Sequence, residues 1–232
     1  MTRFAETPSG ITMYEPEELI LRAGAGTSLV EIREELGRQS QRLRVPMLGS
    51  LGGSVATRRN GIHPSDNAAY PNIVLMCRAR DGRGNAFTAG GPTVKNVSGF
   101  DLVKVLVGSW GTLATIEEVT LRTEPMPRCS RWFKGTGPTG HIFRPSVVWR
   151  QGEATLINIE GHPEDVSAQA KTLNGFVEID APTPQEELLM APVRAHNAAP
   201  FGPLLDICRR LKQSFDPDNI LSPDISVAWG IA

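Results

Sequence analysis

Short apolar runs, several of them alternating with polar residues, occupy the first half of the chain and predict β-strands. The predicted strands lie at residues 11–14, 18–23, 73–79, 85–88 and 115–123. Turn residues separate the runs, and Asp81-Gly82-Arg83-Gly84 predicts a hairpin between the third and fourth strands. Because no strand–helix–strand repeat of the Rossmann kind occurs, we expect an α+β domain with mixed pairing.

Apolar residues spaced three or four positions apart predict three short helices between these strands, at residues 28–37, 54–58 and 101–107. The first begins at Ser28, which is placed to form a capping box with Glu31. The third begins at Asp101, a residue type that stabilises helix N-termini.

Two glycine-rich turns stand out against this background, LGGSVAT at residues 51–57 and GSWGT at residues 108–112. Glycine has no Cβ, and successive backbone N–H groups in such turns can point at an anion. The two turns therefore predict a backbone that lies against a large phosphate-bearing ligand. The alternative is that both are tight connections in a packed α+β domain.

The second half of the chain has a different pattern. Residues 125–140 are rich in Pro, Gly, Arg and Trp, which predicts a domain boundary. Beyond it we expect a hairpin, a helix and a strand in ββαβ order, with two further helices after them. The predicted strands lie at residues 146–150, 154–160 and 176–180, and the predicted helices lie at residues 163–173, 185–190 and 204–215. The predicted domains are residues 1–127 and residues 128–232.

Composition narrows the possible functions. A net charge of −1 and the lack of a basic motif give no support for nucleic-acid binding. No apolar run approaches the ~18–20 residues of a membrane span, so we expect a cytoplasmic protein without a transmembrane segment. The chain has three cysteines that lie far apart in the sequence, Cys77, Cys129 and Cys208, which favours reduced thiols over a disulfide framework. No Cys or His residues are spaced in a pattern that predicts a metal site.

The most specific stretch is KNVSGFDLVKVLVGSWGTLATIEEVTLRT at residues 95–123. Together with LGGSVAT, ILRAGAGTSLVEIREEL and the C-terminal LKQSFDPDNILSP, it resembles the FAD-binding domain of the vanillyl-alcohol-oxidase-type flavoproteins, which have the PCMH-type fold. Within that group the chain is most similar to the glycolate oxidase E subunits. The resemblance runs from about Tyr14 to Thr123, with a second patch at Leu211–Pro223.

This resemblance implies an N-terminally shortened PCMH-type domain over residues 1–127 and a small cap-like ββαβ domain over residues 128–232. It also implies a subunit of an FAD-dependent oxidoreductase, which assists the two-electron oxidation of a 2-hydroxy acid such as glycolate. The implied partners are a D-type flavoprotein subunit and an iron–sulfur subunit. The implied FAD-binding residues are Gly52, Gly53, Ser54 and Val55 near the pyrophosphate and ribityl chain, Gly108, Ser109, Gly111 and Thr112 beside the flavin, Ile116 at the adenine, and Lys95 and Asp101 of the same motif. No residue is identified as catalytic.

The chain also departs from the family pattern. The family's first glycine-rich pyrophosphate loop is not found in the ten residues before Ile11, Ala114 replaces the last glycine of GTLG, and NGIHPSDNAAYPN stands in place of an Arg-rich stretch. The paired-histidine metal motif of relatives that oxidise 2-hydroxy acids does not occur either. Three alternatives follow: an FAD-binding enzyme subunit, a non-catalytic scaffold subunit that has lost FAD, or a chain whose true start lies upstream.

Overall fold

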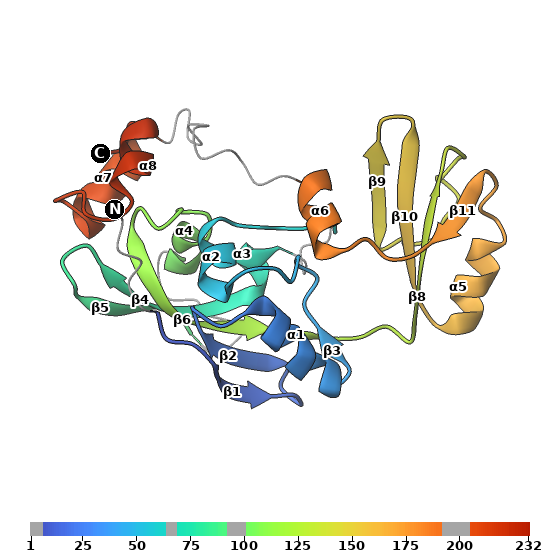
Figure 1. Cartoon of the computed structure of the whole chain (residues 1–232), viewed down its shortest axis with the longest axis horizontal. Coiled ribbons are helices and arrows are strands. Elements are labelled where there is room, and N and C mark those ends of the chain that lie inside the picture. The colour runs from blue at the N-terminus through green and yellow to red at the C-terminus, as the bar shows by residue number, and fades with distance from the viewer. Residues whose placement is uncertain (1–6, 64–68, 92–100, 192–204) are drawn as a thin grey trace.

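The structure is a computed structural model that describes residues 7–63, 69–91, 101–191 and 205–232. Two antiparallel sheets lie side by side along the long axis of the molecule (Figure 1). The first sheet has the strand order β1-β2-β6-β4-β5, with β1 (Ile11–Glu15), β2 (Ile20–Gly24), β4 (Val74–Asp81), β5 (Ala86–Gly90) and β6 (Ala114–Arg122). All five strands predicted from the apolar runs are thus confirmed, with ends that differ by one or two residues. The predicted mixed pairing is wrong, because every strand pair of this sheet is antiparallel.

Four helices accompany the first sheet: α1 (Leu29–Arg38), α2 (Leu51–Ala56), α3 (Tyr70–Ile73) and α4 (Leu102–Leu106). Helix α2 packs against β2 and β6, and α4 packs against β4 and β5 (Figure 1). One core of buried aliphatic side chains joins these helices to the sheet. Burying this apolar surface is the main contribution to the stability of the domain.

Two local predictions for these helices are corrected. The hydroxyl of Ser28 accepts a hydrogen bond from the backbone N–H of Val30 at 3.2 Å, so α1 is capped through Val30 rather than through Glu31. Helix α2 begins at Leu51, not at Ser54, because Ser50 caps it and accepts from Gly53 N. The first glycine turn is therefore the opening turn of a helix.

The second sheet has the order β11-β8-β10-β9, with β8 (Cys129–Gly135), β9 (Val147–Gln151), β10 (Ala154–Gly161) and β11 (Phe176–Ile179), and α5 (Pro163–Ala170) packs against β8 and β10. Strand β8 was not predicted, since it falls inside the Pro/Gly-rich stretch at 125–140. Both of its faces are covered: Phe133 belongs to the cluster under α5, and Trp132 belongs to a separate cluster. The predicted ββαβ order is therefore extended by a central strand.

The last helices return to the first sheet. Helix α6 (Pro184–Met190) precedes α7 (Leu205–Phe215) and α8 (Pro223–Ala228), and the latter two lie beside the β4–β5 end of that sheet (Figure 1). Phe215 packs on Phe87 with ring centroids 5.4 Å apart, and its carbonyl accepts from Gly82 N at 2.8 Å. The domain division at residues 127 and 128 stays a prediction. Within the described residues, no helix combines the length and the apolar character that crossing a membrane requires.

A cluster of charged side chains joins the two sheets. It lies beside the two-stranded ladder of β3 (Gln41–Arg42) and β7 (Glu124–Pro125). The Arg42 guanidinium donates two hydrogen bonds to the Glu160 carboxylate, at 2.5 and 2.6 Å, and one to Glu124 at 2.8 Å. Arg44 pairs with Glu124 as well. Bidentate arginine–carboxylate pairs of this kind fix orientation as well as contact, so this cluster sets how β10 lies relative to β3.

Candidate functional site

The first glycine turn is fixed to the turn that follows β2. Leu51 N donates to the Thr27 carbonyl at 2.9 Å, and Gly52 N donates to the Ala25 carbonyl at 2.8 Å. A Cβ on Gly52 would lie 2.7 Å from the Cβ of Ala25, so only glycine allows this approach. Gly52 is thus buried in a contact within the protein, whereas Gly53 is exposed.

The second glycine turn is joined directly to the end of α2. Gly108 N donates to the Val55 carbonyl at 3.1 Å, and Trp110 N donates to the Ala56 carbonyl at 2.8 Å. The turn has three residues in the left-handed region, Gly108 (φ +83°), Trp110 (φ +55°) and Gly111 (φ +70°). The two turns that the sequence singled out therefore form one continuous edge beside the first sheet.

Most backbone donors along this edge are already used within the protein. Gly53 N donates to the Ser50 hydroxyl at 3.3 Å, Ser109 N donates to the Leu106 carbonyl at 3.1 Å, and Thr112 N donates to the Ser109 carbonyl at 3.0 Å. The expectation of successive free N–H groups is therefore corrected for these positions. The edge still offers close approach at Gly53, and the buried Ser109 hydroxyl has no partner among the described residues.

The other predicted site residues lie around this edge. Val55 and Ile116 are buried in the core, and the Ser54 hydroxyl donates to the Leu48 carbonyl at 3.4 Å. Asp101 is exposed and caps α4 by accepting from Lys104 N. Lys95 lies outside the described residues. The structure thus brings the residues of α2 and of the 108–112 turn together, while Asp101 caps a different helix.

The C-terminal segment holds the second glycine turn in place, a role that sequence reasoning missed. Lys212 is 2 % exposed; its Nζ donates to the Thr112 carbonyl at 2.9 Å and to the Leu221 carbonyl at 3.0 Å, and it pairs with Asp216. Ser222 donates its hydroxyl hydrogen bond to the Trp110 carbonyl at 3.1 Å. The signal in the sequence was a lysine four residues before an aspartate on one helix face, inside LKQSFDPDNILSP.

The loop after α2 connects the candidate site to the second sheet. His63 packs edge-on against Trp132 with ring centroids 6.0 Å apart, and burial lowers the pKa of His63 to about 4. Glu187 of α6 lies against Gly61, and burial raises the pKa of its carboxyl to about 7. The buried Glu187 Oε2 has no partner among the described residues. His63, in the loop that follows the first glycine turn, is thus a residue that packs against β8.

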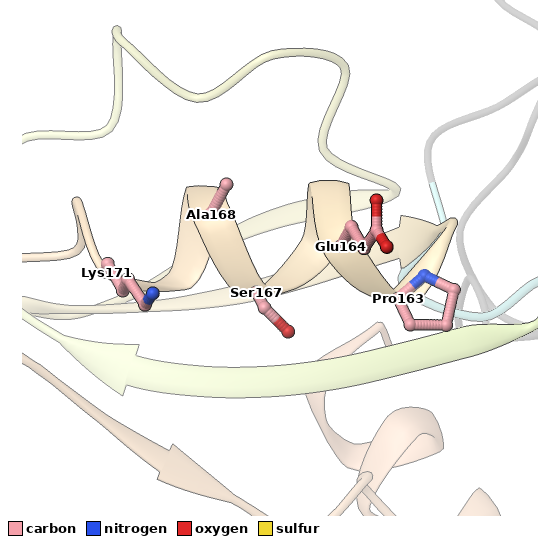
Figure 2. A pocket seen from close by; sticks show the side chains of 5 residues that line it. All are labelled: Pro163, Glu164, Ser167, Ala168 and Lys171. Carbon is pink, nitrogen blue, oxygen red and sulfur yellow. The ribbon is translucent and has the colours of Figure 1, made fainter.

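A shallow hollow runs along α5, where the side chains of five residues line it, Pro163, Glu164, Ser167, Ala168 and Lys171 (Figure 2). Figure 2 shows these side chains leaving one helix in different directions instead of converging. In the described ranges, no three His, Cys, Asp or Glu side chains are grouped so as to hold a metal ion. The joined glycine turns are therefore the candidate site.

Sequence comparisons relate the chain to known proteins. No family model matches the chain. The glycolate oxidase subunit GlcE of Escherichia coli is 36 % identical over 126 residues, which is 52 % of this chain and 36 % of that protein. A D-lactate dehydrogenase of Archaeoglobus fulgidus is 39 % identical over 79 residues, 34 % of this chain and 18 % of that enzyme.

Solved structures give the same fold. An alkyldihydroxyacetonephosphate synthase aligns with a TM-score of 0.57 at 14 % identity, over 78 % of this chain and 45 % of that enzyme. The chain thus spans about a third of the length of GlcE and under half of the synthase. The sequence similarity to GlcE covers about half of the chain, and the structural similarity covers 78 % of it. Over about half of its length the chain is thus similar in sequence to the glycolate oxidase subunit GlcE, and it shares the fold of the alkyldihydroxyacetonephosphate synthase.

Proposed function

We propose that this chain binds FAD at the joined glycine turns and serves as a subunit of an oxidoreductase that acts on 2-hydroxy acids such as glycolate. The observation that carries the proposal is the pair of backbone hydrogen bonds from Gly108 to Val55 and from Trp110 to Ala56, which makes one edge of two distant glycine motifs. The relatives support the reaction class, because glycolate and D-lactate, named in them, are both 2-hydroxy acids.

The residues present fit an extended dinucleotide. The exposed Gly53 carries no side chain to hold a ligand away from the backbone, and Gly108 and Gly111 of the second turn are likewise without side chains and partly accessible. We assign the direct FAD contacts to the accessible residues of this edge, Gly53, Gly108 and Gly111. The buried residues of the predicted set support the edge from within the protein, at Gly52, Ser54, Val55, Ser109, Thr112 and Ile116, while Asp101 caps α4 and Lys95 lies outside the described residues. When bound, FAD supplies the two-electron acceptor, and the protein supplies position and electrostatics.

We also propose that the chain works in a complex. The E. coli relative is by its name one subunit of glycolate oxidase. The partners proposed for this chain are a D-type flavoprotein subunit and an iron–sulfur subunit, the latter because electrons leaving a reduced flavin need an acceptor.

The test is the flavin content of two glycine variants of matched environment. Gly53→Leu places a side chain on the exposed edge of α2, where its Cβ would lie 3.0 Å from the hydroxyl of the capping Ser50, while Gly37→Leu places one on the exposed face of α1, where a Cβ has open space. Gly53→Ala, which adds the Cβ alone, therefore serves as a second control for the contact with Ser50. We expect Gly53→Leu to lose bound FAD and Gly37→Leu to keep it, with both variants folded by circular dichroism. Equal flavin content in both variants would overturn the assignment of the site to this edge.

A further inference from the structure

Two arginines follow α2 directly and stand beside the candidate site, Arg58 and Arg59, here called the arginine pair. Arg58 is exposed and Arg59 half-buried. Neither side chain hydrogen-bonds or forms an ion pair with any residue that the structure describes, and Arg59 interacts electrostatically with the buried phenol of Tyr70. Arg42 and Arg44 of the same domain, by contrast, are both paired with glutamates. Among the residues that the structure describes, the arginine pair therefore brings two positive charges without a carboxylate partner to the edge formed by the glycine turns.

Each arginine lies at a different part of that edge. The Arg59 Nη1 atom lies 3.4 Å from the place where a Cβ of Gly49 would be, at the start of α2. The side chain of Arg58 runs along the second turn, with its Cβ and Cδ atoms 3.3 and 3.6 Å from the Cβ position of Gly108. The backbone fixes both residues, since Arg58 N donates to the Val55 carbonyl at 3.1 Å and Arg59 N to the Ser54 carbonyl at 3.0 Å.

The backbone of Arg58 has a conformation that favours glycine, with φ at +50°. Such a conformation in a residue with a Cβ persists only where the surroundings hold it, and it occurs often at ligand sites. Glycine would adopt it with less strain. The backbone conformation at this position therefore does not favour arginine, and what arginine adds to the edge is its charged side chain.

We propose that the arginine pair binds the diphosphate of the dinucleotide that lies along the glycine turns. Because most backbone N–H groups of the turns bond within the protein, the positive charge for an anion has to come from side chains. A guanidinium offers a planar fork of donors that matches phosphate oxygens in a bidentate manner. This inference rests on the proposed function for the identity of the ligand as FAD.

The test measures binding of inorganic diphosphate and of FAD separately, by titration calorimetry on the purified full chain. The variants are Arg58→Gly and Arg59→Gln, and Arg33→Gln is the matched control, because Arg33 is an exposed arginine of α1 without a partner among the described residues. Losing one charged hydrogen-bonding group should weaken diphosphate binding about tenfold or more. Since Arg58→Gly also relieves backbone strain, its thermal midpoint should equal or exceed that of the wild type.

The outcomes separate the two proposals. Weakened binding of diphosphate and FAD in both variants, with Arg33→Gln unchanged, supports the arginine pair. FAD binding that is the same in the wild type and both variants overturns the arginine pair and leaves the proposed function standing. Arginine-dependent diphosphate binding without any FAD binding supports the pair as a phosphate site and overturns the proposed cofactor. A wild-type chain that binds no diphosphate overturns the arginine pair.

Discussion

Replacing Lys212 with methionine should destabilise the protein far more than an ordinary lysine substitution. The ammonium group is buried and makes contacts with the Thr112 carbonyl, the Leu221 carbonyl and the Asp216 carboxylate. Methionine fills similar space but leaves Asp216 as a buried charge without its cation. Among the residues that the structure describes, the Asp216 carboxylate keeps its bonds from Ile220 N and Leu221 N, at 2.9 and 2.8 Å. Removing one partner of a buried ion pair lowers the free energy of unfolding by about 3–5 kcal/mol.

That loss is a large part of the roughly 5–15 kcal/mol that stabilises a typical domain. At about 2–4 °C per kcal/mol for a protein of this size, the melting temperature of Lys212→Met should fall by roughly 6–20 °C. Thermal and urea denaturation followed by circular dichroism measure the change, with Lys171→Met, at the exposed C-cap position after α5, as control. The double variant Lys212→Met/Asp216→Leu should recover part of the loss, because no charge is left buried alone.

This ion pair is also linked to the candidate site, because the Lys212 ammonium donates a hydrogen bond to the carbonyl of Thr112, 100 residues earlier in the chain. In buffers where Lys212→Met stays folded, we expect the mobility of the 108–112 turn to rise, which hydrogen exchange of that segment measures. A melting temperature of Lys212→Met equal to that of Lys171→Met would refute the conclusion that the buried Lys212–Asp216 pair stabilises the fold.

Three further predictions concern the interface and the glycine turn. Burial raises the pKa of Glu187 to about 7, so the native state keeps a proton that the unfolded state releases above pH 4.5, and stability is lost as the pH rises between these values. The free energy of unfolding of Glu187→Gln relative to the wild type, measured by urea denaturation, should therefore rise by about 2 kcal/mol from pH 5 to pH 8, a figure reduced for partial exposure. A difference that stays constant across this range would contradict the raised pKa. Glu160→Gln removes the carboxylate charge from the two bonds of Arg42 and should cost about 2–4 kcal/mol in the same assay, whereas a loss below ~0.5 kcal/mol would show that the pair does not hold the sheets together. Gly52→Ala forces a Cβ to within 2.7 Å of Ala25 and should cost about 1–3 kcal/mol, and a neutral or stabilising result would mean that the turn relaxes freely.

The sequence predicted the first sheet well because each of its strands has an apolar pattern that short-range reasoning can detect. Strand β8 escaped prediction for a physical reason: Trp132 and Phe133 are adjacent and both buried, one on each face of the second sheet. A strand covered on both faces loses its alternation. The helix α8 escaped because it has only six residues and follows a Ser-Pro step that also fits a loop.

The candidate site was predicted in part. The two glycine turns were identified from composition and resemblance, but their junction depends on hydrogen bonds between residues far apart in the chain, such as Gly108 and Val55. The same long-range bonds occupy the N–H groups that local reasoning left free for an anion. The positions of Arg58 and Arg59 at the edge, and of Lys212 beneath it, follow from this tertiary arrangement and from no local pattern.

The central claim is that the joined glycine turns hold FAD. Its most direct test is the amount of flavin that denaturation releases from the purified wild-type chain, produced alone and together with a D-type partner, measured by visible absorbance and by identification of the released nucleotide. The account predicts close to one FAD for each copy of this chain. Flavin absent from the chain alone, and present in the complex only in the partner's share, would contradict it and favour a scaffold subunit.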